Sequence, residues 1–173
     1  MPATPIRLER FLPYRLSILS NAVSTAIAGA YRRRFSLSVP EWRVLAVLSL
    51  YPGLAAREVA ERTRMDAVAV SRAVGRLLHD GRLRRSRAPA DRRRSVLEVS
   101  PKGAAVYDRI APLALRYERA LVAVLSPIER AMLDRVLSRL LERAGDLGVD
   151  GGDGPSSPRS GGGRRRVGHR RGR

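Results

Sequence analysis

The chain has 173 residues, a length that suits one domain and is short for two. Hydrophobic residues make up 44% of the chain, enough to bury a core, and the absence of cysteine excludes disulfides, cysteine-based zinc sites and thiol chemistry within it. The 34 lysines and arginines outnumber the 16 acidic residues, and the net charge of +18 favours a polyanionic partner such as nucleic acid or an acidic membrane surface.

Several other classes of function find little support. The only histidines are His79 and His169, so neither a histidine-rich metal site nor imidazole-based acid–base chemistry is expected, and we expect no enzyme and no cofactor. No run of residues approaches the roughly 18 apolar positions that a membrane span requires. The first residues lack the charged and apolar regions of a signal peptide, so we expect a cytoplasmic protein.

The first long apolar pattern runs from Leu8 to Arg34, where apolar residues recur mostly at steps of three and four and predict one face of a helix. Pro13 marks the start of this helix or a bend in it. The segment Ser38-Val39-Pro40-Glu41 has the form of a capping box and predicts a second helix, which Tyr51-Pro52-Gly53 ends. Trp42 on that helix is expected in the core, and a role in lining an effector pocket is the alternative.

Two short helices in close succession are expected next. The first runs from Ala56 to about Arg62, and Asp66 is the expected N-cap of a second that ends near His79, before the helix-stop residue Gly81. Only three residues separate them, and so short a turn predicts a helix-turn-helix. The second helix has a predicted buried stripe of Val70, Val74, Leu77 and Leu78. Its predicted outward face consists of Ala67, Val68, Ala69, Ser71, Arg72, Gly75 and Arg76.

This outward face suits the major groove of DNA. Arg72 and Arg76 lie four residues apart, hence on one side, and arginine is well shaped for the O6/N7 edge of guanine. The small side chains at positions 67–69 permit close approach and apolar contact with thymine methyl groups, and Ser71 can donate to a phosphate. The alternatives are that the two arginines are only solvated or that Arg76 pairs with Asp80.

A β-hairpin is predicted directly behind the helix pair. Stretches 82–86 and 95–99 flank a turn-rich centre, and the alternation Leu97-Glu98-Val99 is typical of a half-buried strand. Residues 82–94 carry seven arginines and one aspartate, a net charge of +6 that suits contact with phosphates and with a minor groove; a merely solvated basic hairpin is the alternative. The wing residues expected at DNA are Arg87, Asp91, Arg92, Arg93 and Arg94, and an Asp91–Arg93 ion pair would fix the tip.

The rest of the chain is predicted to be helical up to a change of composition near Asp150. Ser100-Pro101 gives an N-cap with proline at the first helical position, and an apolar stripe continues to Leu125, with Pro112 expected to bend the helix. Ser126-Pro127-Ile128-Glu129 is a second capping box that opens a last helix. Residues 151–173 hold seven arginines, one aspartate and a single aliphatic residue, so we expect a disordered basic tail, either solvated or contacting phosphates.

Residues from about Asn21 to Ile110 resemble the MarR family of bacterial winged-helix transcription regulators. The matching segments are VPEWRVLAVLSLYPGLAAREVAERTRMDAVAVSRAVGRLLHDGRL and DRRRSVLEVSPKG. The second segment carries the more specific pattern, the wing motif formed here by Asp91, Arg93, Leu97, Val99, Ser100 and Gly103. Arg82 departs from the family, which usually has an aliphatic residue after the helix-ending glycine.

The resemblance implies an obligate homodimer whose terminal helices interleave, with Arg93 entering the minor groove and with Ser71 and Arg72 on the recognition helix. It also implies repression at a palindromic operator. In many members a small aromatic or phenolic effector that binds between the domains releases the operator, and the same is implied here.

Together these observations predict a mainly α fold with a small β-hairpin wing, a winged helix-turn-helix with N- and C-terminal dimerisation helices. The expected divisions are a dimerisation helix at 1–35, the DNA-binding core at 36–100, dimerisation helices at 101–150 and the tail at 151–173. The predicted function is that of a homodimeric, sequence-specific regulator of transcription that binds double-stranded DNA. The alternatives are a non-specific architectural DNA-binding protein and a helical adaptor for an acidic protein partner.

Overall fold

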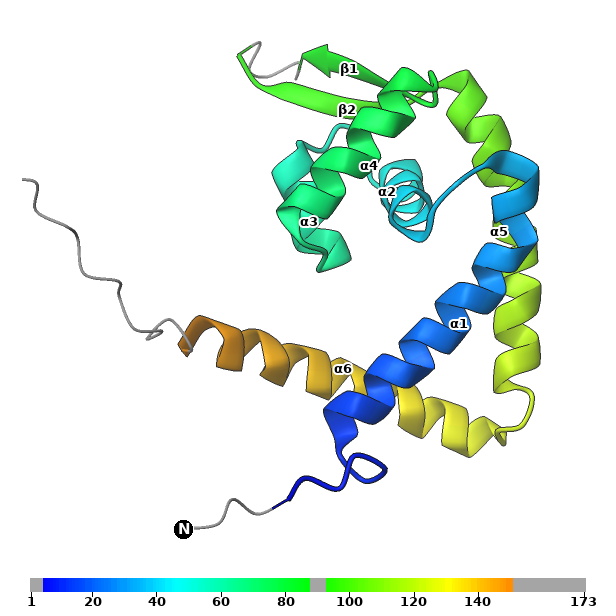
Figure 1. The fold of residues 1–173 in the computed structure, drawn as a ribbon, viewed down its shortest axis with the longest axis vertical. Helices are drawn as coiled ribbons and strands as arrows, with labels where there is room; N and C mark the ends of the chain where they lie inside the picture. The colour runs from blue at the N-terminus through cyan, green and yellow to red at the C-terminus, as the bar shows by residue number, and fades with distance from the viewer. Residues whose placement is uncertain (1–4, 88–92, 151–173) are drawn as a thin grey trace, which may run out of the picture. The chain divides into compact units, whose positions relative to one another are not determined.

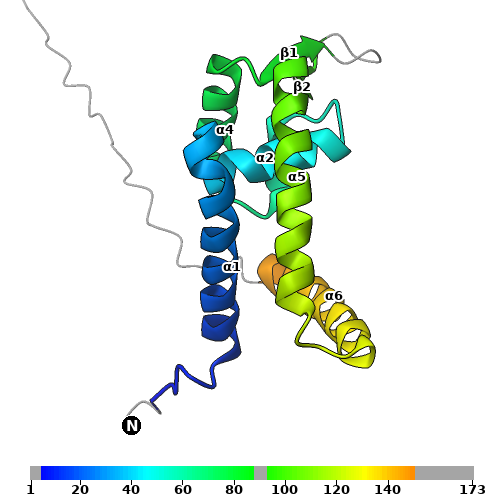
Figure 2. The ribbon, with the colours of Figure 1, turned by 90° about the vertical axis from the view of Figure 1, so that its right-hand side faces the viewer.

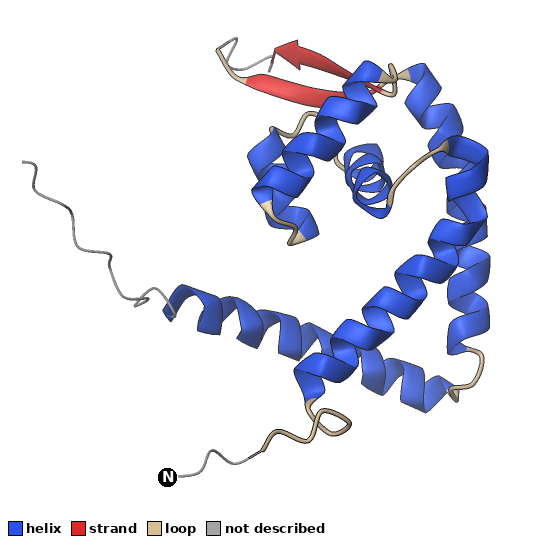
Figure 3. Ribbon diagram, in the orientation of Figure 1, coloured by secondary structure: helices blue, strands red, loops and turns tan. Residues whose placement is uncertain are grey.

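The computed structural model describes residues 5–87 and 93–150, which contain six helices and one β-hairpin (Figures 1 and 3). The elements are α1 (Leu12–Phe35), α2 (Val39–Leu50), α3 (Ala56–Thr63), α4 (Ala67–His79), β1 (Leu83–Arg87), β2 (Ser95–Val99), α5 (Pro101–Val122) and α6 (Pro127–Asp150). Residues up to Ala123 form one compact unit, and those from Val124 form a second. Within the described ranges no helix has both the length and the apolar character to cross a membrane.

Both predicted capping boxes are confirmed. The N–H of Ser38 donates to Oε2 of Glu41 at 3.0 Å, and the N–H of Glu41 donates back to Oγ of Ser38 at 3.4 Å, so the first turn of α2 is capped in both directions. Ser126 and Glu129 make the same reciprocal contacts before α6, at 2.8 and 3.3 Å. Each pair satisfies backbone donors that a helix start leaves without partners.

Three prolines bear on the limits of the long helices. Pro13 lies in the first turn of α1, where the missing N–H has no intrahelical acceptor, so the helix begins at Leu12 rather than several residues earlier. Pro101 opens α5 in the same way, whereas Pro112 lies inside that helix, which continues to Val122. The predicted apolar stripe therefore ends earlier than expected, and Val124 lies beyond the helix with 84% of its surface exposed.

The predicted helix-turn-helix consists of α3 and α4. Arg64 ends α3 in the left-handed backbone region at a φ of 52°. Asp66 caps α4 as predicted, because its Oδ1 accepts the N–H groups of Val68 at 2.9 Å and Ala69 at 3.0 Å. Gly81, at a φ of +69°, then turns the chain into the wing with a backbone conformation that glycine adopts without strain.

The wing is an antiparallel hairpin in which Leu83 lies opposite Val99. Its predicted alternation is only partly present, because Val96 and Leu97 are both buried while Glu98 and Val99 are both half-buried. Leu54, in the loop between α2 and α3, forms a β-bridge with Leu97 on the edge of β2 that does not face β1. This part of β2 is therefore paired along both edges.

The core of the first unit lies between α2, α4, the C-terminal half of α1, the wing and α5. Helices α1 and α5 are in contact and run side by side (Figure 2). Trp42 is half-buried at the edge of this core, between the ring of Tyr31 and the ring of Tyr107, each 5.7 Å away between ring centres. The most deeply buried large side chains are Tyr31, Leu37, Leu45, Leu48, Leu77 and Ile110.

Candidate nucleic-acid interface

Helix α4 has a buried face and an exposed face. Val70, Ala73, Val74 and Leu77 are buried, whereas Leu78, predicted in the same stripe, is only half-buried against the edge of the core. The predicted outward residues are exposed except for Ala69, which is half-buried. The exposed ones are Ala67, Val68, Ser71, Arg72, Gly75 and Arg76.

The two arginines of this face have different surroundings. Arg72 makes no hydrogen bond or ion pair with the residues that the structure describes, whereas Nη1 of Arg76 lies 3.8 Å from Oε1 of Glu41. Glu41 is 4% exposed, and its Oε2 completes the capping box of α2. The alternative pairing of Arg76 with Asp80 is not formed, because Asp80 pairs with Arg82. Arg76 therefore lies beside a buried carboxylate, whereas Arg72 has no such neighbour within the described residues.

Carboxylates also hold two arginines of the wing. Arg84 donates to Oε2 of Glu98 from Nε at 2.9 Å, and the hydroxyl of Ser86 donates to Oε1 of the same carboxylate at 2.8 Å. The hydroxyl of Ser86 and the guanidinium of Arg84 lower the pKa of Glu98. Arg94 pairs with Glu58 of α3. One arginine near the root of the wing and one at the start of β2 are thus paired with carboxylates.

The open end of the wing holds the other predicted contacts. Arg87 ends β1 and Arg93 precedes β2, and both side chains are exposed. Asp91 and Arg92 lie outside the described residues, and so does the predicted Asp91–Arg93 ion pair. The structure therefore brings Arg87 and Arg93 to the same end of the hairpin, next to Arg94 and away from the Arg84–Glu98 pair near its root.

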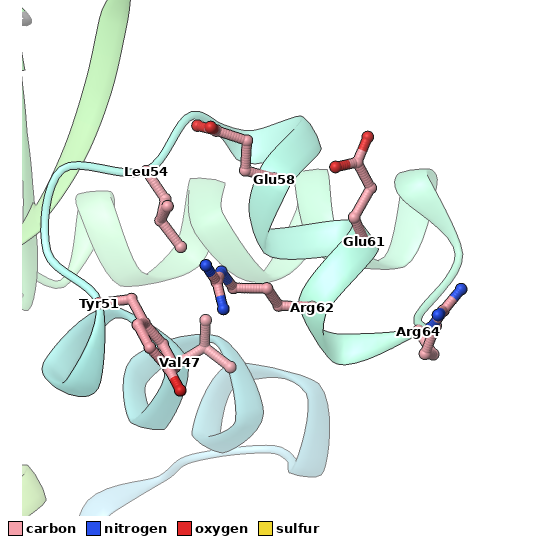
Figure 4. A pocket seen from close by; sticks show the side chains of 7 residues that line it. All are labelled: Val47, Tyr51, Leu54, Glu58, Glu61, Arg62 and Arg64. Atoms are coloured by element: carbon pink, nitrogen blue, oxygen red, sulfur yellow. The ribbon is translucent and has the colours of Figure 1, made fainter. Parts of the chain in front are cut away.

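Two further exposed arginines are absent from the predicted set. Arg64 lies in the turn before Asp66, and Arg85 lies in β1; neither makes an ion pair within the described part of the chain. Arg62 is engaged differently, with its guanidinium carbon 4.1 Å from the ring centre of Tyr51 in a groove between α2 and α3 (Figure 4). Arg64 lies two residues before the N-cap residue Asp66, and its charge and its place next to α4 are the sequence signals that point to it.

Comparison with known proteins identifies the fold and the family. A family model described as MarR family matches residues 35–94, from the end of α1 to the wing. A MarR-family transcriptional regulator from Silicibacter pomeroyi is 28% identical, with a TM-score of 0.72, and the match covers 84% of this chain and 97% of that one. Residues 35–94 match the MarR family, and the chain shares its fold with this MarR-family regulator.

The chain is also similar to other transcriptional regulators. The PcaV transcriptional regulator of Streptomyces coelicolor, solved in complex with its natural ligand, is 26% identical with a TM-score of 0.69 over 82% of this chain and 99% of PcaV. A Thauera aromatica protein named as a transcriptional regulatory protein for the hcr operon is 32% identical over 97 residues, and the HTH-type regulator BilQ of Clostridium symbiosum is 29% identical over 89. The chain spans 58% and 62% of the length of these two curated relatives.

Arg82 stands where an aliphatic residue is expected from the resemblance to the MarR family. Its side chain is 11% exposed, and Nη2 donates to the carbonyl oxygen of Phe35 at 2.6 Å while Nη1 lies 3.5 Å from Oδ2 of Asp80. Nε and Nη1 are buried without a hydrogen-bond partner among the described residues. The strands nevertheless pair in register from Leu83 onwards, so the arginine leaves the wing intact and joins its root to the end of α1.

Proposed function

We propose that this MarR-family chain is a homodimeric transcriptional regulator that reads a palindromic DNA operator and represses the adjacent gene. The observation that carries the proposal is the exposed face of α4, where Arg72 is unpaired among the described residues and the arginine-rich wing follows directly. The net charge of +18 would supply salt-dependent attraction to phosphates. Such a protein would act in the cytoplasm, where a bacterial chromosome lies.

Each predicted contact has a proposed role at the duplex. Arg72 would bind the O6/N7 edge of a guanine in the major groove, and the small side chains at positions 67–69 would allow α4 to approach thymine methyl groups. Ser71 would donate to a phosphate, and Arg76, held by Glu41, would face the backbone. The wing arginines Arg87, Arg92 and Arg93 would enter the neighbouring minor groove, with Asp91 orienting its tip.

Exposed apolar surface on α1 and on α6 supports the homodimer. Large apolar side chains in water mark an interaction surface, because a monomeric soluble protein rarely leaves a contiguous patch of them uncovered. A second copy of the chain would cover both helices and place two recognition helices about 34–36 Å apart. The exposed side chains are Leu12, Tyr14, Leu16, Ile18 and Leu19 on α1, and Met132, Leu133, Val136, Leu137, Leu140 and Leu141 on α6.

Binding to duplexes selected from a random DNA library tests this function. At physiological salt we expect two chains per selected duplex, a pseudo-palindromic consensus, and affinity about 10³–10⁷ times tighter than for random duplex. A ratio near one would support the non-specific architectural protein instead. Failure to retard any duplex at moderate salt would support the protein adaptor.

Replacing Arg72 with alanine is expected to relax discrimination at one base pair of each half-site by about 1–3 kcal/mol, because a bidentate contact to guanine is lost. The measurement is the affinity for every single-base variant of the selected site. Arg57→Ala is the matched control: Arg57 is an exposed arginine of α3 paired with Glu61, so its loss removes the same charge and leaves the preferred sequence unchanged. An unaltered preference in Arg72→Ala would show that α4 is not the recognition helix.

A small aromatic or phenolic effector is the second part of the proposal. A cavity of about 270 Å³ lies between α1 and α2, with Tyr31 and Trp42 on its wall and with Arg43 donating to Ser24 at 3.1 Å beside it. Burial raises the pKa of Tyr31, so its hydroxyl stays protonated at neutral pH. PcaV, which shares the fold, was solved with a natural ligand. The cavity is lined by Ser20, Val23, Ser24, Ile27, Tyr31, Val39, Trp42 and Arg43.

Trp42 makes the effector proposal testable, because it is the only tryptophan in the chain. Titration with a series of hydroxylated benzoates is expected to quench its fluorescence and, over the same concentration range, to release the selected duplex. Arg43→Gln should weaken both effects together, since the cavity then lacks its cation. Release of DNA without quenching would place the effector elsewhere, and the absence of both effects across the series would remove this part of the proposal.

A further inference from the structure

Strand β2 of the wing and the residue before it are attached to the helix-turn-helix and the loop that precedes it at two places. The N–H of Leu97 donates to the carbonyl oxygen of Leu54 at 2.8 Å, and the N–H of Gly53 donates to the carbonyl oxygen of Leu97 at 3.1 Å, so the loop before α3 is bridged to β2. Arg94, three residues before Leu97, forms an ion pair through Nη2 with Oε2 of Glu58 on α3. The bridge fixes β2 by its backbone, and the ion pair fixes the segment that leads into it.

Glu58 is held in place by the helix that carries it. Ala55, at the N-cap position of α3, has no side-chain oxygen, so Glu58 supplies the side-chain cap by accepting the N–H of Ala55 at 2.7 Å. The N–H of Ala55, followed by the guanidinium of Arg94, lowers the pKa of Glu58, so the carboxylate is charged at neutral pH. A carboxylate oriented by a helix start is a fixed acceptor for the wing arginine.

Within the described residues, Arg94 is the cationic side chain that hydrogen-bonds to Glu58, because the neighbouring arginines of α3 are engaged elsewhere. The carboxylate of Glu58 is turned away from the guanidinium of Arg62, which lies over Tyr51 (Figure 4). Arg57 is engaged with Glu61 at 2.9 Å. For Arg94 to reach a DNA phosphate, it would have to leave a charge-assisted hydrogen bond that is already made.

We propose that Glu58 and Arg94 are positioning residues that fasten the open end of the wing, at the start of β2, to α3, and that Arg94, although part of the basic cluster, is not itself a DNA contact. This proposal rests on the proposed DNA-binding function. Fastening the wing before DNA arrives reduces the conformational freedom that binding would otherwise remove. The pair would act through Arg93, its neighbour in the chain, which the same anchor carries to the minor groove.

The test compares Glu58→Gln, Arg94→Gln and the double variant in binding to the selected duplex at several salt concentrations. Each single variant is expected to weaken binding about two- to fivefold, the range of a partly exposed ion pair, and the double variant should be no weaker than the singles. The slope of log affinity against log salt should stay unchanged, because no phosphate contact is lost. The glutamine at position 58 still offers an oxygen to the N–H of Ala55, which preserves the helix cap.

If Arg94 is a DNA contact instead, the variants are expected to change the affinity for DNA differently. If Arg94 contacts a phosphate, Glu58→Gln would release the arginine and tighten DNA binding, and Arg94→Gln would reduce the slope of log affinity against log salt by about 0.9. Either result overturns the proposal. Unchanged affinity in both single variants would overturn it as well. Glu61→Gln is the matched control, because it removes the same charge from α3 by breaking the Arg57–Glu61 pair, which does not touch the wing. It should not weaken binding.

Hydrogen exchange on the protein without DNA separates this proposal from the proposed function. Glu58→Gln and Arg94→Gln are each expected to accelerate exchange of the β1 and β2 amides several-fold, whereas Glu61→Gln should leave them unchanged. If the variants accelerate exchange of the wing amides but the protein binds no duplex selectively, the proposed regulator function is wrong and the Glu58–Arg94 attachment of the wing is supported. Unchanged exchange in a protein that does select a duplex would overturn the anchor alone.

Discussion

Replacing Leu77 with alanine is expected to lower the free energy of unfolding by about 2–5 kcal/mol, the range for removing a leucine from a tightly packed core. Leu77 is 0% exposed and lies on the face of α4 that packs against α2. The empty volume would loosen the helix that carries the proposed DNA-reading face, so stability and selective DNA binding should fall together. Chemical denaturation at a fixed protein concentration measures the effect, since the stability of the proposed homodimer would depend on concentration.

Leu78→Ala is the matched control for this prediction. It removes the same atoms from the next residue of the same helix, but Leu78 is only half-buried at the edge of the core. Less apolar surface returns to water and the site can relax, so the loss should be clearly smaller than for Leu77. Equal losses at the two positions would contradict the burial pattern assigned to α4.

Replacing Gly103 with alanine is expected to lower the free energy of unfolding by about 1–3 kcal/mol, because the added methyl group has no room. A Cβ at this position would lie far inside the contact distance of the carbonyl oxygen of Arg82 and 2.9 Å from Cγ1 of Val99. That carbonyl accepts the N–H of Ser100 at 3.0 Å, so it cannot move without disturbing the start of α5. A fall in the midpoint of chemical or thermal unfolding measures the effect.

Gly75→Ala should have the opposite sign. Gly75 lies on the exposed face of α4, a Cβ there would meet nothing within 4 Å, and its backbone is helical. Alanine in a helix reduces the freedom of the unfolded chain, so the stability of the protein should rise by about 0.4–1 kcal/mol. If Gly103→Ala were as well tolerated as Gly75→Ala, the close approach between the wing root and α5 would be wrong.

Features that depend on residues three or four positions apart could be predicted from the sequence. Ser38 with Glu41 and Ser126 with Glu129 are reciprocal caps, and Asp66 caps α4, because the partner of each side chain is the adjacent turn of backbone. The exposed face of α4 is predictable for the same reason, since helical periodicity alone separates it from the buried stripe. Only half-buried positions such as Ala69 and Leu78 differ from the expectation.

The partners of the arginines could not be predicted, because they are set by the tertiary fold. Arg94 is 36 residues from Glu58, and Arg82 is 47 residues from the carbonyl group of Phe35. A count of positive charge treats all arginines of the wing as available to phosphates, whereas Arg84 and Arg94 are paired with carboxylates. The placement of the wing against the loop before α3 likewise depends on backbone pairing at Leu97, which no local pattern indicates.

The buried guanidinium of Arg82 has a mechanical consequence. Its side chain donates a hydrogen bond to the carbonyl group of Phe35, the last residue of α1. Its backbone, at the start of the wing, donates to the carbonyl group of Leu77 near the end of α4 and accepts the N–H of Ser100 at the start of α5. If a ligand bound between α1 and α2 and tilted α1, either the Arg82–Phe35 hydrogen bond would break or the base of the hairpin would move with the helix. The length of one side chain thereby limits how far α1 and the hairpin can move independently of each other.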